Sequence, residues 1–339
     1  MTNKTRVLNV AMKDPTPKLV VLVLGALINY SPQAARQLDQ QEDSYREAIE
    51  RLESGEGAYA AALPEQLLSL GLNLQQSGRH EEAVKLFRRG VHLARINNGL
   101  YSAEQIPLIE REIASQVAMQ QYSEADERQR YLYRVQMRNL ESGLGRAEAL
   151  MQQAQWQYNA YRLAVNGNDY NRLMSMWDLY RLALNDIVAR EGETSATLMR
   201  PLQGMLLSQY LIAGYTYDNQ SSGSDENFSA QQSANRFNAY RAQGYTKGRA
   251  VIQAMYDIQK ANKGENSSET AAALTMMGDW SLWNGERDAA MQFYQAANAE
   301  LVAAGAAEKD IQAVFGAPVA LPNYEGARYL PEPVDAEDG

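Results

Sequence analysis

The amino-acid sequence predicts an all-α protein built from repeated pairs of antiparallel helices. Apolar residues recur at helical spacing on both sides of a short polar turn within residues 64–97. A second copy of that pattern follows 42 residues later. Of the ten prolines, only three fall between residues 33 and 317, as expected of a mostly helical middle.

The stretch 64–97 predicts two closely packed helices joined at a tight turn. Gly78 stands where the first helix should end. Gly71 and Ala83 are small residues at the expected crossing points, so the two helices can approach closely. The stretch resembles a tetratricopeptide repeat (TPR), a 34-residue helix-turn-helix unit. The positions that match the TPR signature are Leu67, Leu70, Gly71, Leu74, Gly78, Ala83 and Phe87.

The resemblance implies a right-handed superhelix of about five TPR-like units, some of them degenerate. The 42-residue displacement maps His80 onto Tyr122 and Ala83 onto Ala125, and it is similar to the longer TPR variety of kinesin light chains. The second unit has Ile113 where the signature has a small residue. Pro107 should lie in the first turn of the first helix of this second unit, where a backbone N–H would have no partner within the helix in any case.

The remaining units follow in order along the chain. The third should have helices near 146–165 and 170–190, and the fourth should be interrupted by a polar insertion at 217–233 after a helix that ends near Tyr215. A helix should resume by Arg236 and continue to about Lys263. The fifth unit again matches the TPR signature, at Leu274, Met277, Gly278, Gly285, Ala290, Tyr294 and Ala297.

We therefore expect four segments: a signal peptide or anchor at 1–35, a capping helix at 36–60, a helical solenoid at 61–315 and a proline-rich acidic tail at 316–339. The first segment has a basic lead followed by ten apolar or uncharged residues at 19–28. This pattern is typical of a secretory signal, and the run is too short for an ordinary membrane span. The alternatives are an uncleaved anchor or a buried helix in a cytoplasmic protein.

Composition argues against several classes of function. The net charge of −9 disfavours nucleic-acid binding, and the absence of cysteine excludes disulfides and thiolate metal sites. His80, which should be buried at the repeat corner, and His92 are the only imidazoles, so catalysis by histidine has little material. We expect neither a metal nor a cofactor. Residues 218–229 match part of a calcium loop but have Ser229 where a bidentate Glu is needed.

The first helices of a TPR array line its concave groove, so the resemblance implies which residues face a partner. A mixed surface of leucine, glutamine and tryptophan suits an apolar or amphipathic peptide, whereas capture of a C-terminal carboxylate needs Lys and Asn instead. The alternative is that Leu68 and Leu72 pack on the helix at 36–60 and that Trp283 is buried. The candidate partner-binding residues are Glu65, Leu68, Leu72, Gln75, Gln76, Asp279, Leu282 and Trp283.

The sequence thus predicts a non-enzymatic scaffold or adaptor for protein–protein interaction, exported to the bacterial periplasm or associated with an inner-membrane complex. One alternative rests on residues 315–322, which weakly resemble the joint between a TPR region and a TonB-like energy-transducer domain. They would make the chain an accessory to such machinery. The other alternative, a helical-solenoid enzyme acting on cell-wall glycan, has no acidic motif to support it.

Overall fold

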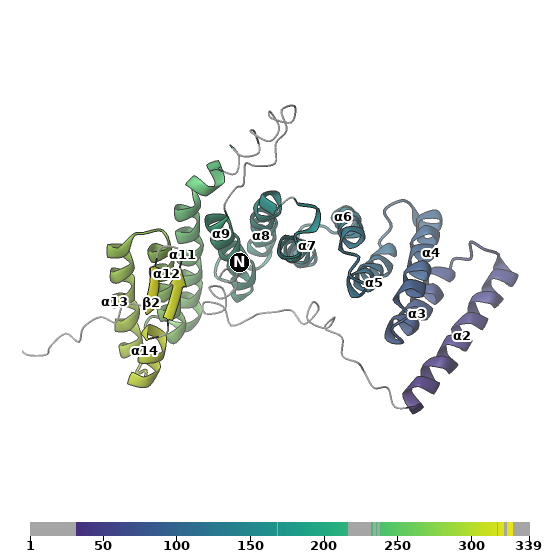
Figure 1. Ribbon diagram of the computed structural model, residues 1–339, viewed down its shortest axis with the longest axis horizontal. Coiled ribbons are helices and arrows are strands. Elements are labelled where there is room, and N and C mark those ends of the chain that lie inside the picture. The colour runs from purple at the N-terminus through teal and green to yellow at the C-terminus, as the bar shows by residue number, and fades with distance from the viewer. Residues whose placement is uncertain are drawn as a thin grey trace, which may run out of the picture. The chain divides into compact units, whose positions relative to one another are not determined.

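The computed structural model describes residues 32–167, 169–215, 232, 235 and 238–316, together with the backbone of 318–321 and 324–327 (Figure 1). These residues are almost all helical, and they form two compact parts that divide between residues 168 and 169. In each part, helices pack against their neighbours in sequence. The prediction of an all-α fold made of consecutive helix pairs is confirmed.

The N-terminal part contains six α-helices and a short 3-10 turn among its described residues. Each α-helix packs against the next along the chain, from α2 through to α7. The elements are α2 (Pro32–Glu56), α3 (Leu63–Gln76), α4 (His80–Asn98), α5 (Gln105–Ala118), α6 (Tyr122–Asn139), α7 (Leu144–Arg162) and η2 (Val165–Gly167).

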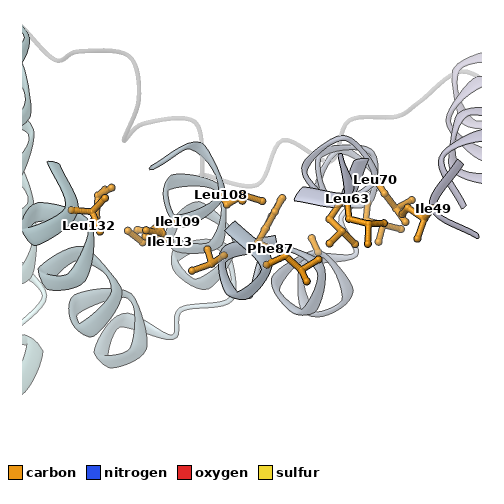
Figure 2. Close-up of a cluster of buried hydrophobic side chains, with 14 of the residues drawn as sticks. Ile49, Leu63, Leu70, Phe87, Leu108, Ile109, Ile113 and Leu132 are labelled. Carbon is orange, nitrogen blue, oxygen red and sulfur yellow. The ribbon is translucent and has the colours of Figure 1, made fainter. Parts of the chain in front are cut away.

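The core of this part runs as a row of apolar side chains from helix to helix. Figure 2 shows the row beginning at Ile49 of α2, passing Leu70 of α3 and Phe87 of α4, and reaching Leu132 of α6. A core of this kind is spread thinly along the stack, so every helix keeps an exposed face. Helix α2 turns an apolar stripe toward this core, because Ile49 belongs to the cluster and Tyr45 and Leu52 pack against it.

Polar contacts add to the packing of α2 on the first helix pair. The Asn73 side-chain amide donates to the backbone carbonyl of Leu38, with 3.0 Å between Nδ2 and O. Arg79 Nη1 lies 2.7 Å from Glu42 Oε2, and Arg89 also forms an ion pair with Glu53. These contacts connect α2 to both α3 and α4.

Three helix pairs are closed by the same turn. After α3, Gly78 adopts a φ of 74°, and the Arg79 amide donates to Leu74 O at 2.8 Å. This is the Schellman arrangement, in which a residue of left-handed conformation ends the helix. Gln120 after α5 and Gly285 after α12 (Ser268–Trp283) hold the same place, with φ values of 59° and 85°. The turn predicted from Gly78 therefore recurs, once without glycine.

The C-terminal part contains the remaining described helices and one hairpin. Packing again follows chain order, from α8 to α9, α9 to α11, α11 to α12 and α12 to α13. The elements besides α12 are α8 (Asp169–Glu191), η3 (Ala196–Leu198), α9 (Met199–Gly214), α11 (Gly244–Lys263), α13 (Arg287–Ala303), α14 (Glu308–Phe315), β1 (Pro318–Leu321) and β2 (Tyr324–Ala327).

Glycines in this part allow aromatic rings to lie against helix backbones. A Cβ on Gly278 would stand 2.2 Å from Cε1 of Tyr294, and a Cβ on Gly248 would stand 2.2 Å from Cε2 of Trp280. Both rings are fully buried, so neither can move aside to admit a side chain. The packing role expected of Gly278 from the TPR signature is thus visible as a ring-on-backbone contact.

The structure differs from the sequence prediction at several points. The segment 316–339, for which the sequence predicted only a proline-rich acidic tail, contains the antiparallel pair β1–β2, in which Leu321 pairs with Tyr324. The third unit's helices begin or end up to three residues from the expected positions. His80 is half-buried rather than buried. Residues 1–31 of the predicted signal peptide or anchor at 1–35, the calcium-like loop at 218–229 and nearly all of the insertion at 217–233 lie outside the described residues.

Candidate partner-binding site

The candidates on α3 occupy its partly exposed face. Glu65 and Gln76 are exposed, whereas Leu68 and Leu72 are half-buried. Leu68 packs against the core cluster that includes Ile49 of α2, so part of its surface is committed to the fold. Leu72 is not among the described residues that pack against this cluster.

Gln75 connects two helices within the fold. Its Nε2 donates to Ser115 Oγ at 2.9 Å and to the Arg111 carbonyl at 3.2 Å, both on α5. The side-chain nitrogen of Gln75 is therefore used in holding the first unit to the second, and only the remaining surface of this half-buried residue is open to a partner.

The candidates on α12 differ in how far solvent reaches them. Asp279 is only 3% exposed, and its Oδ1 accepts a hydrogen bond of 2.8 Å from the hydroxyl of Tyr294. Leu282 is buried in the core cluster of α12, α13 and α14. Asp279 therefore acts within the fold, by fixing the ring that packs against Gly278. Trp283 is half-buried, and its ring meets that of Tyr210 edge-on at 5.1 Å.

Trp283 also lines a hollow of about 300 Å³ at one end of the C-terminal part. The hollow lies where the end of α9, the beginning of α11 and the end of α12 meet, and these helices are neighbours in Figure 1. Its lining combines amide, guanidinium and aromatic groups with small apolar residues. The lining residues are Gln209, Ile212, Ala213, Arg241, Gly244, Trp283 and Asn284.

Gln209 is the most unusual group in this hollow. Its side chain is 1% exposed, yet neither Oε1 nor Nε2 has a hydrogen-bond partner among the described residues. Buried polar groups in folded proteins are nearly always paired. A Cβ added to Gly244 would stand 3.4 Å from Gln209 Oε1, so the glycine leaves space beside the acceptor.

Sequence reasoning found Trp283 but missed Gln209, Arg241 and Gly244. One signal was available, because Gln209 stands four residues after Met205 and three before Ile212, both of which are buried in α9. An amide within a helical apolar stripe must either find a partner inside the fold or face a binding site. The positions of Arg241 and Gly244 relative to Gln209 carry no comparable signal in the sequence.

A second hollow, of about 270 Å³, lies in the N-terminal part between the α5–α6 turn and the end of α7. Ser123 Oγ donates to Asn166 Oδ1 across it at 3.2 Å. Its other polar lining residues are exposed or half-buried. It therefore lacks a buried, unpaired group comparable to Gln209.

The described residues contain no cluster of three or more His, Asp or Glu side chains placed to hold a metal ion. Burial lowers the pKa of His80, whose Nδ1 lies 3.5 Å from Ser115 Oγ. Among the helices that the structure describes, none is long and apolar enough to cross a membrane.

The chain matches no protein-family model and no curated protein sequence. Among solved structures, it is similar to a kinesin-light-chain-like protein of Podosopora anserina with nearly identical TPR-like repeats. The TM-score is 0.41 at 15% identity, covering 71% of this chain and 95% of that one. It is also similar to BtubC (BKLC) of P. vanneervenii, with a TM-score of 0.37 at 13% identity, covering 80% of this chain and 93% of that one.

Proposed function

We propose that this protein is a non-enzymatic scaffold that binds a protein or peptide segment on the faces of its first helices, α3 and α12. The observation that carries the proposal is the consecutive packing of helices in each compact part, with the thin core of the N-terminal part drawn in Figure 2. A stack of this kind keeps one face of every helix available, which suits it to extended or helical partners.

Two surfaces are the best candidates for contact within this architecture. On α3, the half-buried Leu72 stands near the exposed Glu65 and Gln76. On α12, Trp283 presents an indole at a hollow. Aromatic side chains that are partly exposed beside a concavity are the groups that dominate protein interfaces energetically. We therefore expect Trp283 and Leu72 to contribute most to partner binding.

The cell envelope of a bacterium is the location we propose. The basic lead and the apolar run at 19–28 support it. Mass spectrometry of the mature protein should find an N-terminus between about Asn29 and Gln40. Removal up to Ala35 would also take the first turn of α2, which begins at Pro32. An intact Met1 on a cytoplasmic protein would contradict export without affecting the scaffold proposal.

Photo-crosslinking in the native cell tests the binding surfaces. A photoreactive amino acid is placed at Leu72 or at Trp283 and, as a matched control, at Lys85, an exposed position on α4. We expect discrete crosslinked proteins from the first two positions and none of the same size from the control. In parallel, Leu72→Glu and Trp283→Ala should leave the helical circular dichroism intact and weaken recovery of those proteins.

Two results would contradict binding at the faces of α3 and α12. If both variants recover the crosslinked proteins as well as the natural chain does, the first-helix faces are not the binding surface. The second helices or the tail at 318–339 would then be the surfaces to examine. If no position on α3 or α12 yields a crosslink in the cell, the scaffold proposal itself fails.

A further inference from the structure

The hollow at the ends of α9, α11 and α12 contains Gln209, the one amide among the described residues whose two side-chain polar atoms are both themselves buried and unpaired. The buried amide of Gln129, by contrast, donates to Gln153 Oε1 at 3.1 Å. A fold gains nothing from burying an unpaired amide, because leucine would fill the same space without the loss of hydrogen bonds to water. The exception therefore indicates a partner that arrives from outside the fold.

The geometry of a carboxamide restricts what that partner can be. Oε1 accepts and Nε2 donates side by side, so the complementary group must present one N–H and one C=O on the same side. A residue in extended conformation does this with its own backbone, as each hydrogen-bonded pair in an antiparallel sheet shows. A free carboxamide offers the same pair of groups. Anions offer acceptors only and would leave Oε1 unpaired.

The rest of the lining adds charge and shape. Arg241, at the rim, is exposed and lies on the chain just before α11, so a carboxylate beside the paired residue would meet a guanidinium. Trp283 supplies an aromatic wall on the α12 side. A volume of about 300 Å³ is at the small end of ligand sites, which suits one or two residues of a chain rather than a folded element.

We propose that this hollow binds one residue of an extended, acidic peptide segment, with Gln209 pairing to the backbone of that residue and Arg241 receiving a neighbouring Asp or Glu side chain. This rests on the proposed scaffold function and gives it a defined ligand chemistry. The paired residue is recognised through its backbone, so specificity comes from the adjacent acid and from the side chain against Trp283.

The first test uses a displayed library of random 12-residue peptides, selected on the full-length protein. Peptides enriched on the natural chain should carry Asp or Glu far above the starting frequency. Their binding should fall at least tenfold on Gln209→Leu and should be unchanged on Gln203→Leu, a matched control on the same helix whose side chain does not line the hollow. N-methylation of a single backbone position in an enriched peptide should abolish binding, because it removes the paired N–H.

Gln209→Leu also gives a readout that a structural role would not produce. Replacing an unpaired buried amide with an apolar side chain of similar size should raise Tm by about 2–4 °C while binding is lost. Gly244→Ala tests the same site from the other wall, since its methyl group would stand 3.4 Å from Gln209 Oε1, in van der Waals contact, and would occupy the space that the ligand needs beside the acceptor. We expect a helical fold of unchanged or higher Tm and at least a fivefold loss of peptide binding.

Three results would overturn the proposal. They are a lower Tm for Gln209→Leu, enriched peptides that bind Gln209→Leu as well as the natural chain, and a selection that enriches no peptide dependent on Gln209. Free glutamine competing with the peptides at similar concentration would assign the hollow to a small carboxamide instead. If crosslinking at Leu72 succeeds while these tests fail, the scaffold function stands and only the ligand of this hollow is wrong.

Discussion

The first and second helix pairs share one architecture but bury different chemistry at their contacts. In α3–α4, Gly71 lies against the ring of Phe87, and a Cβ on that glycine would stand 2.3 Å from Phe87 Cε1. In α5–α6, Ile113 takes the place of the glycine. Helix α3 buries one polar side chain, Asn73, whereas α5 buries four: Gln105, Glu112, Ser115 and Gln116.

The buried carboxylate of Glu112 is the centre of the second arrangement. Its Oε1 lies 2.8 Å from Arg88 Nε of α4, and its Oε2 lies 2.6 Å from Arg128 Nη2 of α6. One carboxylate thus connects α5 to both neighbouring helices. The comparison teaches that neighbouring helices can be held together either by close ring-on-glycine packing or by a buried ion-pair network. The turns after α3 and α5 have the same form in both cases.

The largest expected effect comes from removing both partners of Glu112. In Arg88→Ala/Arg128→Ala, a carboxylate that is 0% exposed has no counter-charge, and such broken pairs cost 3–5 kcal/mol. Because Arg88 is itself 55% exposed and water can enter from its side, we expect about 3 kcal/mol. Hydrogen exchange of α4–α6 measures this, with α12–α13 peptides as the internal reference.

Two further variants sharpen that result. Arg95→Ala, which removes an exposed arginine from the end of α4, should change protection by no more than about 0.5 kcal/mol. Replacing all three charges, as Glu112→Leu/Arg88→Met/Arg128→Met, should restore most of the loss, since apolar packing often replaces a buried ion pair. If the triple variant is as unstable as the double one, apolar side chains cannot replace the ion-pair network at this contact.

A smaller effect is expected at the glycine of the first pair. In Gly71→Ala the new methyl group overlaps the ring of Phe87, which is fully buried, and overpacking of this kind costs about 1–3 kcal/mol. The higher helix propensity of alanine offsets up to about 1 kcal/mol. Urea unfolding should show a net loss. The matched control is Gly145→Ala in α7, where the nearest atom is 3.9 Å away and the same substitution should not destabilise.

The turns allow a reciprocal exchange between the two pairs. Gln120 holds a φ of 59° after α5, a conformation that costs a side chain about 1 kcal/mol relative to glycine. Gln120→Gly should therefore stabilise the protein by up to that amount, and Gly78→Gln should destabilise it similarly. If Gln120→Gly instead lowers the stability of the protein, the contacts of the glutamine side chain stabilise the turn by more than its positive φ costs.

The sequence predicts the first and fifth pairs well for a physical reason. Small and aromatic residues at fixed spacing, such as Gly71 with Phe87 and Gly278 with Tyr294, require two antiparallel helices in close contact. The spacing of these residues in the sequence is therefore enough to predict how the two helices pack. The second pair resembles the TPR signature only in degenerate form, and the ion pairs of Glu112 have no local pattern in the sequence, because the two arginines lie 24 residues before it and 16 residues after it.

The candidate site was predictable only in part. Helical spacing places Asp279 and Trp283 one turn apart on the same face of α12, but the Tyr294 hydroxyl of α13 reaches Asp279 and holds it inside the fold. Whether Asp279 is exposed therefore depends on a side chain from the next helix, which the spacing within α12 cannot reveal. The hollow requires three helix ends to converge, and that arrangement follows from packing angles and loop lengths rather than from the residues at any one of those ends.

The smallest expected effect concerns His80, which begins α4 at the boundary between the two pairs. Burial lowers the pKa of its imidazole below the ordinary value of 6.5. The folded state therefore binds fewer protons than the unfolded state just below pH 6.5, and the His80 contribution to stability is lost as the pH falls through this range. Well above pH 6.5, the ring is neutral in both the folded and the unfolded state, and His80 no longer makes stability depend on pH.

In urea unfolding between pH 7.5 and 5, the free energy of unfolding of His80→Gln should fall less steeply than that of the natural chain. His92→Gln, which alters the exposed imidazole of the same helix, should follow the natural chain. Parallel profiles for His80→Gln and the natural chain would show that Ser115 and the α3–α4 turn leave the ring open enough to protonate freely in the fold.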